Sequence, residues 1–209
     1  MKIGILGAGN VGGTLGEAWA KRGHSVMFGV REPQGEAMAE LIARCDGHGH
    51  AGSPDQAAGF GDVLVNALPW PVTKEVLSAL SLDGKVVFDA TNPLLPQLAG
   101  LEVGTTTSGA ELVAGWARGA SVVKIFNTTG FGNMGNPIYK KEKIPMLYCG
   151  DDSEAKALAA GLANEIGFAA VDAGPLANAR LLEPLAMLWI WLAHMGGVGP
   201  DFAFQIVKR

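Results

Sequence analysis

The chain opens with a strand pattern, a glycine-rich turn and a helix pattern, in that order. Lys2–Leu6 is a short apolar run typical of a buried strand, and Gly7-Ala8-Gly9-Asn10-Val11-Gly12 follows it directly. Asn10–Arg22 then carries apolar residues at helical spacing, and Gly23 ends it. A G-x-G-x-x-G turn in this position is typical of a strand–helix–strand unit in a parallel sheet. No other feature of the sequence constrains the fold as strongly.

Strand and helix patterns continue to alternate through the first 130 residues. Further strands are expected at Ser25–Val30, His48–Gly52, Asp62–Leu68, Gly84–Ala90 and Ser121–Phe126. Helices are expected at Gly35–Arg44, from Ser53-Pro54, at Pro71–Leu82 and at about Ser108–Arg118. This alternation predicts a Rossmann-type, doubly wound α/β fold with a mostly parallel sheet and helices on both faces.

The pattern changes in residues 131–209, which we interpret as a small C-terminal extension of the 1–130 core. Pro145–Cys149 is expected to run antiparallel, because a parallel partner would need a crossover connection. A helix over Ser153–Ile166, with Ser153 as its N-cap, and a last strand at Phe168–Asp172 should follow. Pro175–Met195 should be mostly helical. Without a linker or repeat, residues 1–209 are predicted to form a single dinucleotide-binding domain.

Composition excludes several classes of protein. The chain has 209 residues, of which 48% are hydrophobic and 17% charged, so it is not disordered. Its net charge of −4 argues against a nucleic-acid binder, and no apolar run is long enough to span a membrane. The two cysteines cannot make a disulfide framework, and the N-terminal residues lack the longer apolar stretch and cleavage site expected of a signal peptide. A cytoplasmic protein is therefore expected.

The glycines of the first turn fit a dinucleotide. Gly7 would make the tight turn, Gly9 would let a pyrophosphate approach the backbone, and Gly12 would let the helix pack closely on the strand. The phosphates would face free N–H groups at the positive end of the helix. The alternative is a tight strand–helix turn without a ligand.

The end of the second strand favours NADP over NAD. An acidic residue at this point would bind the ribose hydroxyls of NAD, whereas an arginine would meet the extra phosphate of NADP. The sequence has Val30 and Arg31 at this point. Two alternatives are a ribose contact from Glu32 and a plain surface ion pair between Arg31 and Glu32 or Glu36.

Polar residues follow three neighbouring strand patterns, in Asn66–Trp70, Asp89–Pro93 and Phe126–Gly130. Ligands of parallel sheets bind beyond the carboxyl ends of the strands, so these segments should share one cleft. Their amides suit a carboxamide and ribose hydroxyls, and Trp70 suits a flat ring. The alternative is that Asn, Thr and Pro simply form turns.

Six segments occur in the same order in one family: GAGNVG, FGVREP, ALPW, DATNP, VVKIFNTTG and DAGPLANARLLE. The chain resembles NADP oxidoreductases dependent on the deazaflavin coenzyme F-420, related bacterial dinucleotide-binding reductases, and the cytosolic domain of membrane metalloreductases. The resemblance implies that Gly9–Gly12 binds the pyrophosphate and that Val30 and Arg31 hold the adenosine phosphate. The family usually has Ser at the position of Val30. The segment FNTTGFGNM is more similar to the general bacterial reductases than to the archaeal enzymes that use the deazaflavin coenzyme.

The resemblance also implies that Leu68, Pro69 and Trp70 lie near the nicotinamide. Together with the strand-end residues, the predicted cofactor-binding set is Gly7, Gly9, Asn10, Val11, Gly12, Val30, Arg31, Leu68, Pro69, Trp70, Thr91, Asn92 and Asn127.

The expected function is an NADP(H)-dependent oxidoreductase that transfers a hydride between the nicotinamide and a deazaflavin or flavin-like acceptor. Such a transfer needs aligned rings and exclusion of water rather than acid–base catalysis, so no catalytic residue is assigned. Two alternatives are an NADPH-dependent reductase of a small carbonyl or imine and a non-enzymatic dinucleotide sensor. A carbonyl reductase would need a proton donor, for which the candidates are Lys124, Asp89, His194 and Tyr139. Lys124 is more simply explained by a side chain that snorkels to water or pairs with a carboxylate.

Three further sequence features remain: a metal-like spacing, a basic run and an apolar helix. Cys45, His48 and His50 have metal-like spacing but no second ligand group, so no metal site is predicted. Lys140–Lys143 could meet an anionic cofactor tail but fits a solvated loop. Leu181–Met195 is apolar nearly all round and too short to span a membrane, so it needs a cover. A second subunit of a homodimer is the expected cover, and burial within this fold is the alternative.

Overall fold

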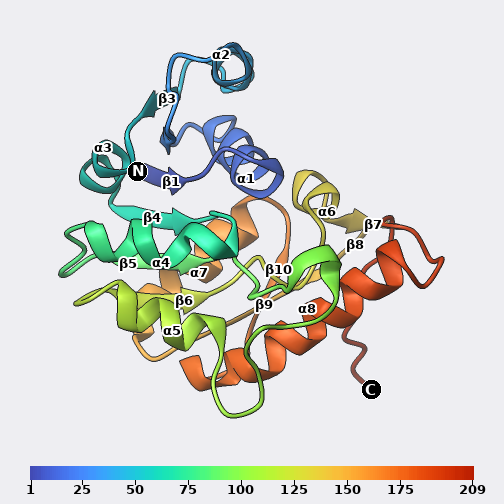
Figure 1. The fold of residues 1–209 in the computed structure, drawn as a ribbon. Helices are drawn as coiled ribbons and strands as arrows, with labels where there is room; N and C mark the ends of the chain where they lie inside the picture. Colours follow the sequence, from blue (N-terminus) through green and yellow to red (C-terminus); the bar gives the residue numbers. More distant parts are fainter.

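One large sheet organises the molecule. A computed structural model describes all residues 1–209. The sheet has eight strands in the order β10-β9-β6-β5-β4-β1-β2-β3 (Figure 1). These strands are β1 (Lys2–Leu6), β2 (Ser25–Gly29), β3 (Gly49–Gly52), β4 (Val63–Asn66), β5 (Val86–Asp89), β6 (Ser121–Lys124), β9 (Pro145–Gly150) and β10 (Ala169–Asp172). Every strand predicted from the sequence lies in this sheet, which confirms the Rossmann-type fold class.

The strand directions also agree with the prediction. β1 to β6 are mutually parallel where they pair, as expected for strands joined by helical crossovers. β9 pairs antiparallel with β6 through Lys124 and Cys149, and β10 pairs parallel with β9. The C-terminal extension therefore continues the sheet of the core and does not form a separate layer.

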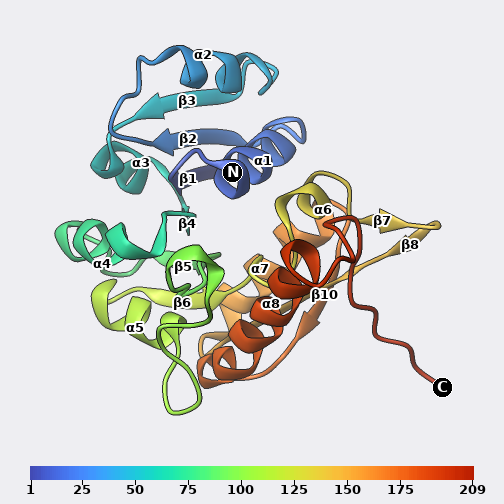
Figure 2. The ribbon, with the colours of Figure 1, turned by 45° about the vertical axis from the view of Figure 1, so that its right-hand side comes forward.

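Helices cover both faces of the sheet, as the strand–helix alternation requires (Figures 1 and 2). Buried residues of α1, α2, α6 and α7 join one hydrophobic cluster, and those of α3, α4, α5 and α8 join the other. The helices are α1 (Asn10–Ala20), α2 (Glu36–Ala43), α3 (Pro54–Phe60), α4 (Trp70–Ala79), α5 (Gly109–Trp116), α6 (Phe131–Gly135), α7 (Ser153–Glu165) and α8 (Ala179–His194), with single 3₁₀ turns η1 (Pro96–Leu98) and η2 (Leu176–Asn178).

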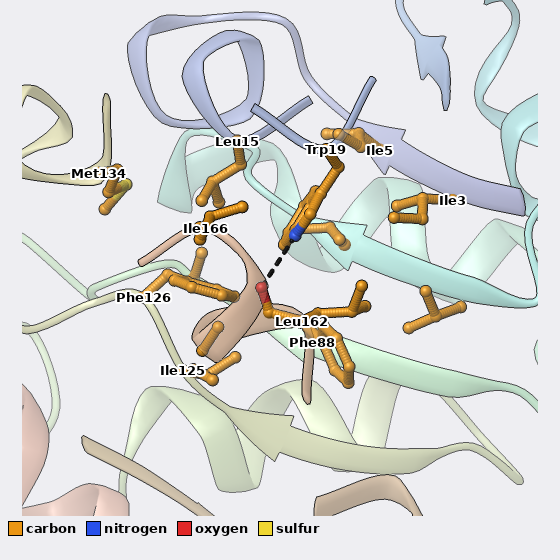
Figure 3. Close-up of a cluster of buried hydrophobic side chains, with 14 of the residues drawn as sticks. Ile3, Ile5, Leu15, Trp19, Phe88, Ile125, Phe126, Met134, Leu162 and Ile166 are labelled. Carbon is orange, nitrogen blue, oxygen red and sulfur yellow. Dashed lines mark hydrogen bonds between the residues drawn. The ribbon is translucent and has the colours of Figure 1, made fainter. Parts of the chain in front are cut away.

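The larger cluster joins the first helix to the extension. Trp19 of α1 is fully buried, and its indole Nε1 donates to the Leu162 carbonyl of α7 at 3.1 Å (Figure 3). The same ring meets Phe126 edge-on, with 5.6 Å between ring centroids. Because a buried indole N–H needs a partner, this contact fixes α7 against α1 as well as filling space.

Two local features differ from the sequence expectation. The segment Asn127–Ile144, which has no helical period, contains the short α6 and a hairpin of β7 (Ile138–Tyr139) and β8 (Glu142–Lys143) that projects from the molecule (Figure 2). The cap predicted for Ser153 is wrong by one residue, because the Asp152 carboxylate accepts from the Ala155 N–H at 2.7 Å. Ser153 is instead the first residue of α7.

No helix of the structure combines the length and hydrophobicity that crossing a bilayer requires. The apolar α8 contains 16 residues, Glu183 among them.

Candidate functional site

The glycine turn has the geometry that its spacing predicts. Gly7 has a φ of +92°, and a Cβ at this position would lie 2.8 Å from the Ala67 carbonyl oxygen. A Cβ at Gly12 would lie 2.2 Å from the Gly7 carbonyl oxygen, so only glycine lets α1 approach the turn this closely. A Cβ at Gly9 would meet nothing within 4 Å. Gly7 and Gly12 are therefore required by the fold, whereas Gly9 faces space that a ligand could fill.

The N-terminus of α1 is open to an anion. Gly9 is its N-cap, no side chain caps the first N–H groups, and no acidic residue lies in the first turn. These N–H groups carry the positive end of the helix dipole. A cavity of about 230 Å³ adjoins them, lined by Ala8 to Asn10, by Leu41 of α2 and by Phe131 of α6. The arrangement has room and polarity for a pyrophosphate.

Val30 and Arg31 follow the end of β2, next to the glycine turn. The Val30 N–H donates to the Gly52 carbonyl at 2.9 Å, which ties this segment to β3. Arg31 is exposed and takes part in none of the ion pairs, so pairing with Glu32 or Glu36 is not what holds it. The guanidinium is thus free to meet a phosphate.

A row of buried polar side chains crosses the carboxyl ends of β4, β5 and β6. Asn66, Asp89 and Lys124 are direct partners in the sheet register, and none of them is exposed. Asp89 accepts from the Asn66 amide at 3.0 Å and from Lys124 Nζ at 2.8 Å. The Thr91 hydroxyl also donates to Asp89, at 2.8 Å, and the Thr91 carbonyl accepts from Lys124 at 2.5 Å. The row converts three strand ends into one hydrogen-bonded unit.

A second carboxylate completes this cluster from the opposite end of the chain. Glu183 of α8 lies 2.9 Å from Lys124 Nζ and is also fully buried. Burial disfavours the charged ammonium, but Asp89 and Glu183 outweigh this effect and hold the pKa of Lys124 above its ordinary value. Of the two interpretations of Lys124, the structure shows the carboxylate pair and not a side chain that snorkels to water. A firmly held ammonium of this kind is a poor general acid near neutral pH.

Beyond this row, the segments after β5 and β6 are held together by two amides. Asn127 Nδ2 donates to Asn92 Oδ1 at 3.1 Å, and Asn92 Nδ2 donates to the Asn127 carbonyl at 3.0 Å. Asn127 Oδ1 has no hydrogen-bond partner, although the residue is 4% exposed. Asn66 Oδ1, in the row of strand-end residues, is also buried without a partner. A buried acceptor without a partner is costly, so these two amide oxygens are the atoms of this site that most need a ligand donor.

The backbone before Asn127 is strained. Phe126 has a φ of +63°, in the left-handed region that bulky residues rarely adopt. Its side chain is fully buried, and its N–H donates to Met146 Sδ at 3.3 Å. Such conformations cluster at functional sites, where the surrounding structure enforces them. Here the turn directs the chain out of β6 and places Asn127 beside Asn92.

The three predicted site residues after β4 differ in how accessible they are to a ligand. Leu68 is half-buried and Pro69 exposed, so both can reach a ligand. Trp70 begins α4 and is 9% exposed: its ring packs on Trp116 at 5.3 Å, and Nε1 donates to Glu102 at 2.8 Å. The structure thus brings Thr91, Asn92 and Asn127 together, while the Trp70 ring lies mainly between α4 and α5.

The remaining proton-donor candidates do not converge on this site. The Tyr139 hydroxyl donates to Asn133 Oδ1 at 2.6 Å, and burial raises its pKa. His194 is exposed at the end of α8. Burial also raises the pKa of the Cys149 thiol to about 12, which keeps it protonated and unreactive.

The metal-like spacing of Cys45, His48 and His50 does not become a cluster. Cys45 is buried and donates to the Leu41 carbonyl, and His50 packs on Phe60. No group of three His, Cys, Asp or Glu side chains with metal-binding geometry forms in the structure.

Glu183 and Phe131 are the site residues that sequence reasoning missed. Glu183 could have been found as the single carboxylate in the apolar run Leu181–Trp191. A buried acid in such a helix requires a partner. Phe131 gave no signal, because α6 is too short to show a helical period.

Comparison with known proteins finds similar reductases. Residues 2–93 match the family described as "NADP oxidoreductase coenzyme F420-dependent". The chain is 29% identical to the metalloreductase STEAP3 of Rattus norvegicus over 91% of its own length and 38% of the relative. It is 32% identical to an F420-dependent NADP reductase of Methanocaldococcus jannaschii over 65% of the chain and 64% of the relative. It therefore spans less than two thirds of either protein.

Other relatives align over more of their length. An F420-dependent NADP reductase of Methanothermobacter marburgensis is 29% identical over 91% of both chains. A crystal structure from Arthrobacter sp. FB24, assigned as an F420-dependent NADP reductase, superimposes with a TM-score of 0.88 and 29% identity over the whole of both chains. An imine reductase of Aspergillus terreus shares the fold, with a TM-score of 0.67 and 21% identity over 94% of this chain and 63% of the other. The matches confirm the resemblance that the motifs indicated, and the match to the F420-dependent NADP oxidoreductase family covers residues 2–93 of this chain.

Proposed function

We propose that this protein is an NADP(H)-dependent oxidoreductase that transfers a hydride between the nicotinamide and a deazaflavin or flavin-like acceptor. The glycine turn carries the proposal, because Gly9 faces open space at an uncapped helix N-terminus. The family match and the names of the relatives, all reductases, support the same reaction class. In this proposal residues 1–209 act as one dinucleotide-binding domain.

The cofactor would lie across the carboxyl ends of the strands. Gly9 to Gly12 would bind the pyrophosphate, with Asn10 and Val11 supplying backbone N–H groups of the first turn. Arg31, next to Val30, would pair with the adenosine phosphate. The nicotinamide end would then meet residues at the ends of β4, β5 and β6, namely Leu68, Pro69, Trp70, Thr91, Asn92 and Asn127.

A bound NADPH would supply the hydride. The residues of this chain would orient the ring, with Asn127 Oδ1 as an acceptor for the carboxamide N–H, and would keep water away. No proton donor is required for transfer between two ring cofactors. This fits a site in which the nearest ammonium, Lys124, is already held by two carboxylates.

Anaerobic mixing with NADPH identifies the acceptor. The protein is mixed in turn with coenzyme F-420, with FMN and with a panel of small carbonyl and imine compounds, and absorbance spectra are followed. The proposal expects NADPH oxidation with bleaching of F-420 or FMN. Oxidation with a carbonyl or imine alone would favour the smaller-substrate reductase, and NADPH binding without oxidation by any acceptor would favour a sensor.

We also propose that the protein is a homodimer through α8. Its exposed apolar residues are seven, three and four positions apart, as residues on one helix face are: Leu181, Leu188, Trp191 and, just after the helix, Met195. The opposite face packs within the chain, where Trp189 is 5% exposed and stacks on Phe202. A second copy of α8 would cover the exposed face by two-fold symmetry.

A further inference from the structure

Glu183 uses both carboxylate oxygens to connect three elements. Oε2 accepts from the Gly109 N–H at 2.8 Å, and Oε1 accepts from the Ala110 N–H at 3.0 Å. These groups form the N-terminus of α5, where a negative charge is favourable. Oε1 also lies 2.9 Å from Lys124 Nζ of β6. The side chain is fully buried, so it locks the first turns of α8 against α5 and the sheet.

The residue before Glu183 contacts the site directly. Asn127 Nδ2 donates to the Leu182 carbonyl at 3.3 Å and to Asn92 Oδ1 at 3.1 Å. An amide nitrogen has two hydrogens, so both are used. The amide cannot rotate without losing a bond, and its unpartnered oxygen, Oδ1, keeps one direction. The orientation of Asn127 therefore depends on the position of the α8 backbone at Leu182.

We propose that Glu183 is a positioning residue for the nicotinamide end of the site. It acts through Leu182 and Asn127: the carboxylate fixes the first turn of α8, the Leu182 carbonyl fixes the Asn127 amide, and Asn127 Oδ1 accepts a hydrogen bond from the carboxamide N–H of the cofactor. The inference rests on the proposed function. It assigns to the C-terminal extension a role in orienting the cofactor, which the glycine turn and Arg31 at the opposite end of the sheet cannot supply.

The Glu183→Gln variant tests this role with the cofactor alone. The amide cannot pair with Lys124 and accept from both N–H groups of α5, while the Asp89–Lys124 pair remains. Affinity is measured for NADPH and for 2′,5′-ADP, which lacks the nicotinamide, and the fluorescence lifetime of bound NADPH reports the order of the ring. We expect unchanged 2′,5′-ADP affinity, NADPH affinity lowered about three- to tenfold, and a lifetime closer to that of free NADPH.

Glu111→Gln is the matched control. Glu111 also joins α5 to α8, through Arg180 at 2.5 and 2.9 Å, but its carboxylate contacts neither Lys124 nor Asn127. This variant should bind both ligands as the wild type does. Glu183→Asp keeps the negative charge but places it one methylene closer to the α8 backbone, so it should show a smaller effect of the same kind. This variant replaces Glu183→Gln in the test if Glu183→Gln does not fold.

Three results would overturn the proposal. They are a wild-type NADPH lifetime in a folded Glu183 variant, an equal loss of affinity for both ligands, and the same response in Glu111→Gln. A wild-type protein that binds neither ligand would reject the proposed function itself, and the role of Glu183 would fall with it.

Discussion

At the residue scale, Asn127 combines a strained approach with an unsatisfied acceptor. Phe126 bends the backbone into the left-handed region, and Asn127 Oδ1 is then buried without a partner. Both features are costly for the protein alone and become useful when a ligand donor is present. Neither is visible in the sequence, because FNTTG is also an ordinary turn composition.

Asn127→Ala should lower the rate of hydride transfer more than it lowers NADPH affinity. A displacement of about 1 Å at the ring can reduce the rate on the order of a hundredfold. Binding should fall less, because in the proposed binding mode the glycine turn and Arg31 would hold the other end of the cofactor. Single-turnover oxidation of bound NADPH by its best acceptor measures the rate. An unchanged rate in folded protein would place the reacting ring elsewhere.

Arg31→Ala should weaken NADPH binding by about ten- to a hundredfold, because one charge-assisted hydrogen bond to a phosphate contributes about that much affinity. NADH lacks this phosphate, so its binding should weaken much less. Arg31 is exposed and has no ion-pair partner to compensate. Titration of both cofactors by fluorescence gives the ratio. Glu32→Gln is the matched variant, since a selective loss of NADH affinity there would make Glu32 the ribose ligand. Equal losses for both cofactors in Arg31→Ala would argue against NADP selectivity.

At the scale of elements, periodicity and turn chemistry predict the secondary structure of long segments but not that of short ones. The strand patterns and the antiparallel direction of β9 follow from apolar runs and connection lengths. α6 and the β7–β8 hairpin do not, because five-residue and two-residue elements carry too few positions to show a period. α6 nevertheless brings Phe131 to the cavity beside Gly9.

For helix α8, the sequence does not show which face is covered within the chain. The sequence shows an apolar helix and predicts that something must cover it, but the structure is needed to separate its two faces. Trp189 is covered by Phe202 within the chain, whereas Trp191 is 50% exposed. Both tryptophans lie in the same apolar run of the sequence, and the structure distinguishes them.

Trp191→Glu should convert a wild-type dimer into a folded monomer, because a charge at the centre of an apolar two-fold interface meets its own copy. Trp189→Glu should instead destabilise or precipitate the protein, since it breaks an internal stack. Light scattering at micromolar concentration measures the mass. Val72→Glu, which alters an exposed apolar residue on α4, is the control and should leave the mass unchanged. A monomeric wild type would refute the dimer.

At the scale of the whole molecule, the buried charges join β5, β6, α5 and α8. Sequence patterns allowed Lys124 either to snorkel or to pair with a carboxylate, and they did not name Asp89 as its partner. They did not reveal that Glu183 would be the second partner. That pairing depends on where α8 crosses the sheet, which no local pattern encodes.

Lys124→Met should lower the free energy of unfolding by about 3–5 kcal/mol, because two buried carboxylates lose their cation while the side-chain volume is kept. Urea denaturation measures the change. Lys21→Met, which removes an exposed pair with Glu17, should lower the free energy of unfolding much less, because water screens that pair. A similar small loss for Lys124→Met would show that the carboxylates can relax toward water.

The late position of Glu183 in the chain has a consequence for synthesis on the ribosome. Chains are made and begin to fold from the N-terminus, so β1 to β6 and the glycine turn can assemble while α8 is still being translated. At that stage Lys124 has only Asp89 as a partner, and water can still reach both. The arrival of α8 brings Glu183 and removes that water. The part of the proposed site beside β1 and β2 can thus form in the nascent chain before the part beside β6, which is completed only when the later-made helix α8 is in place.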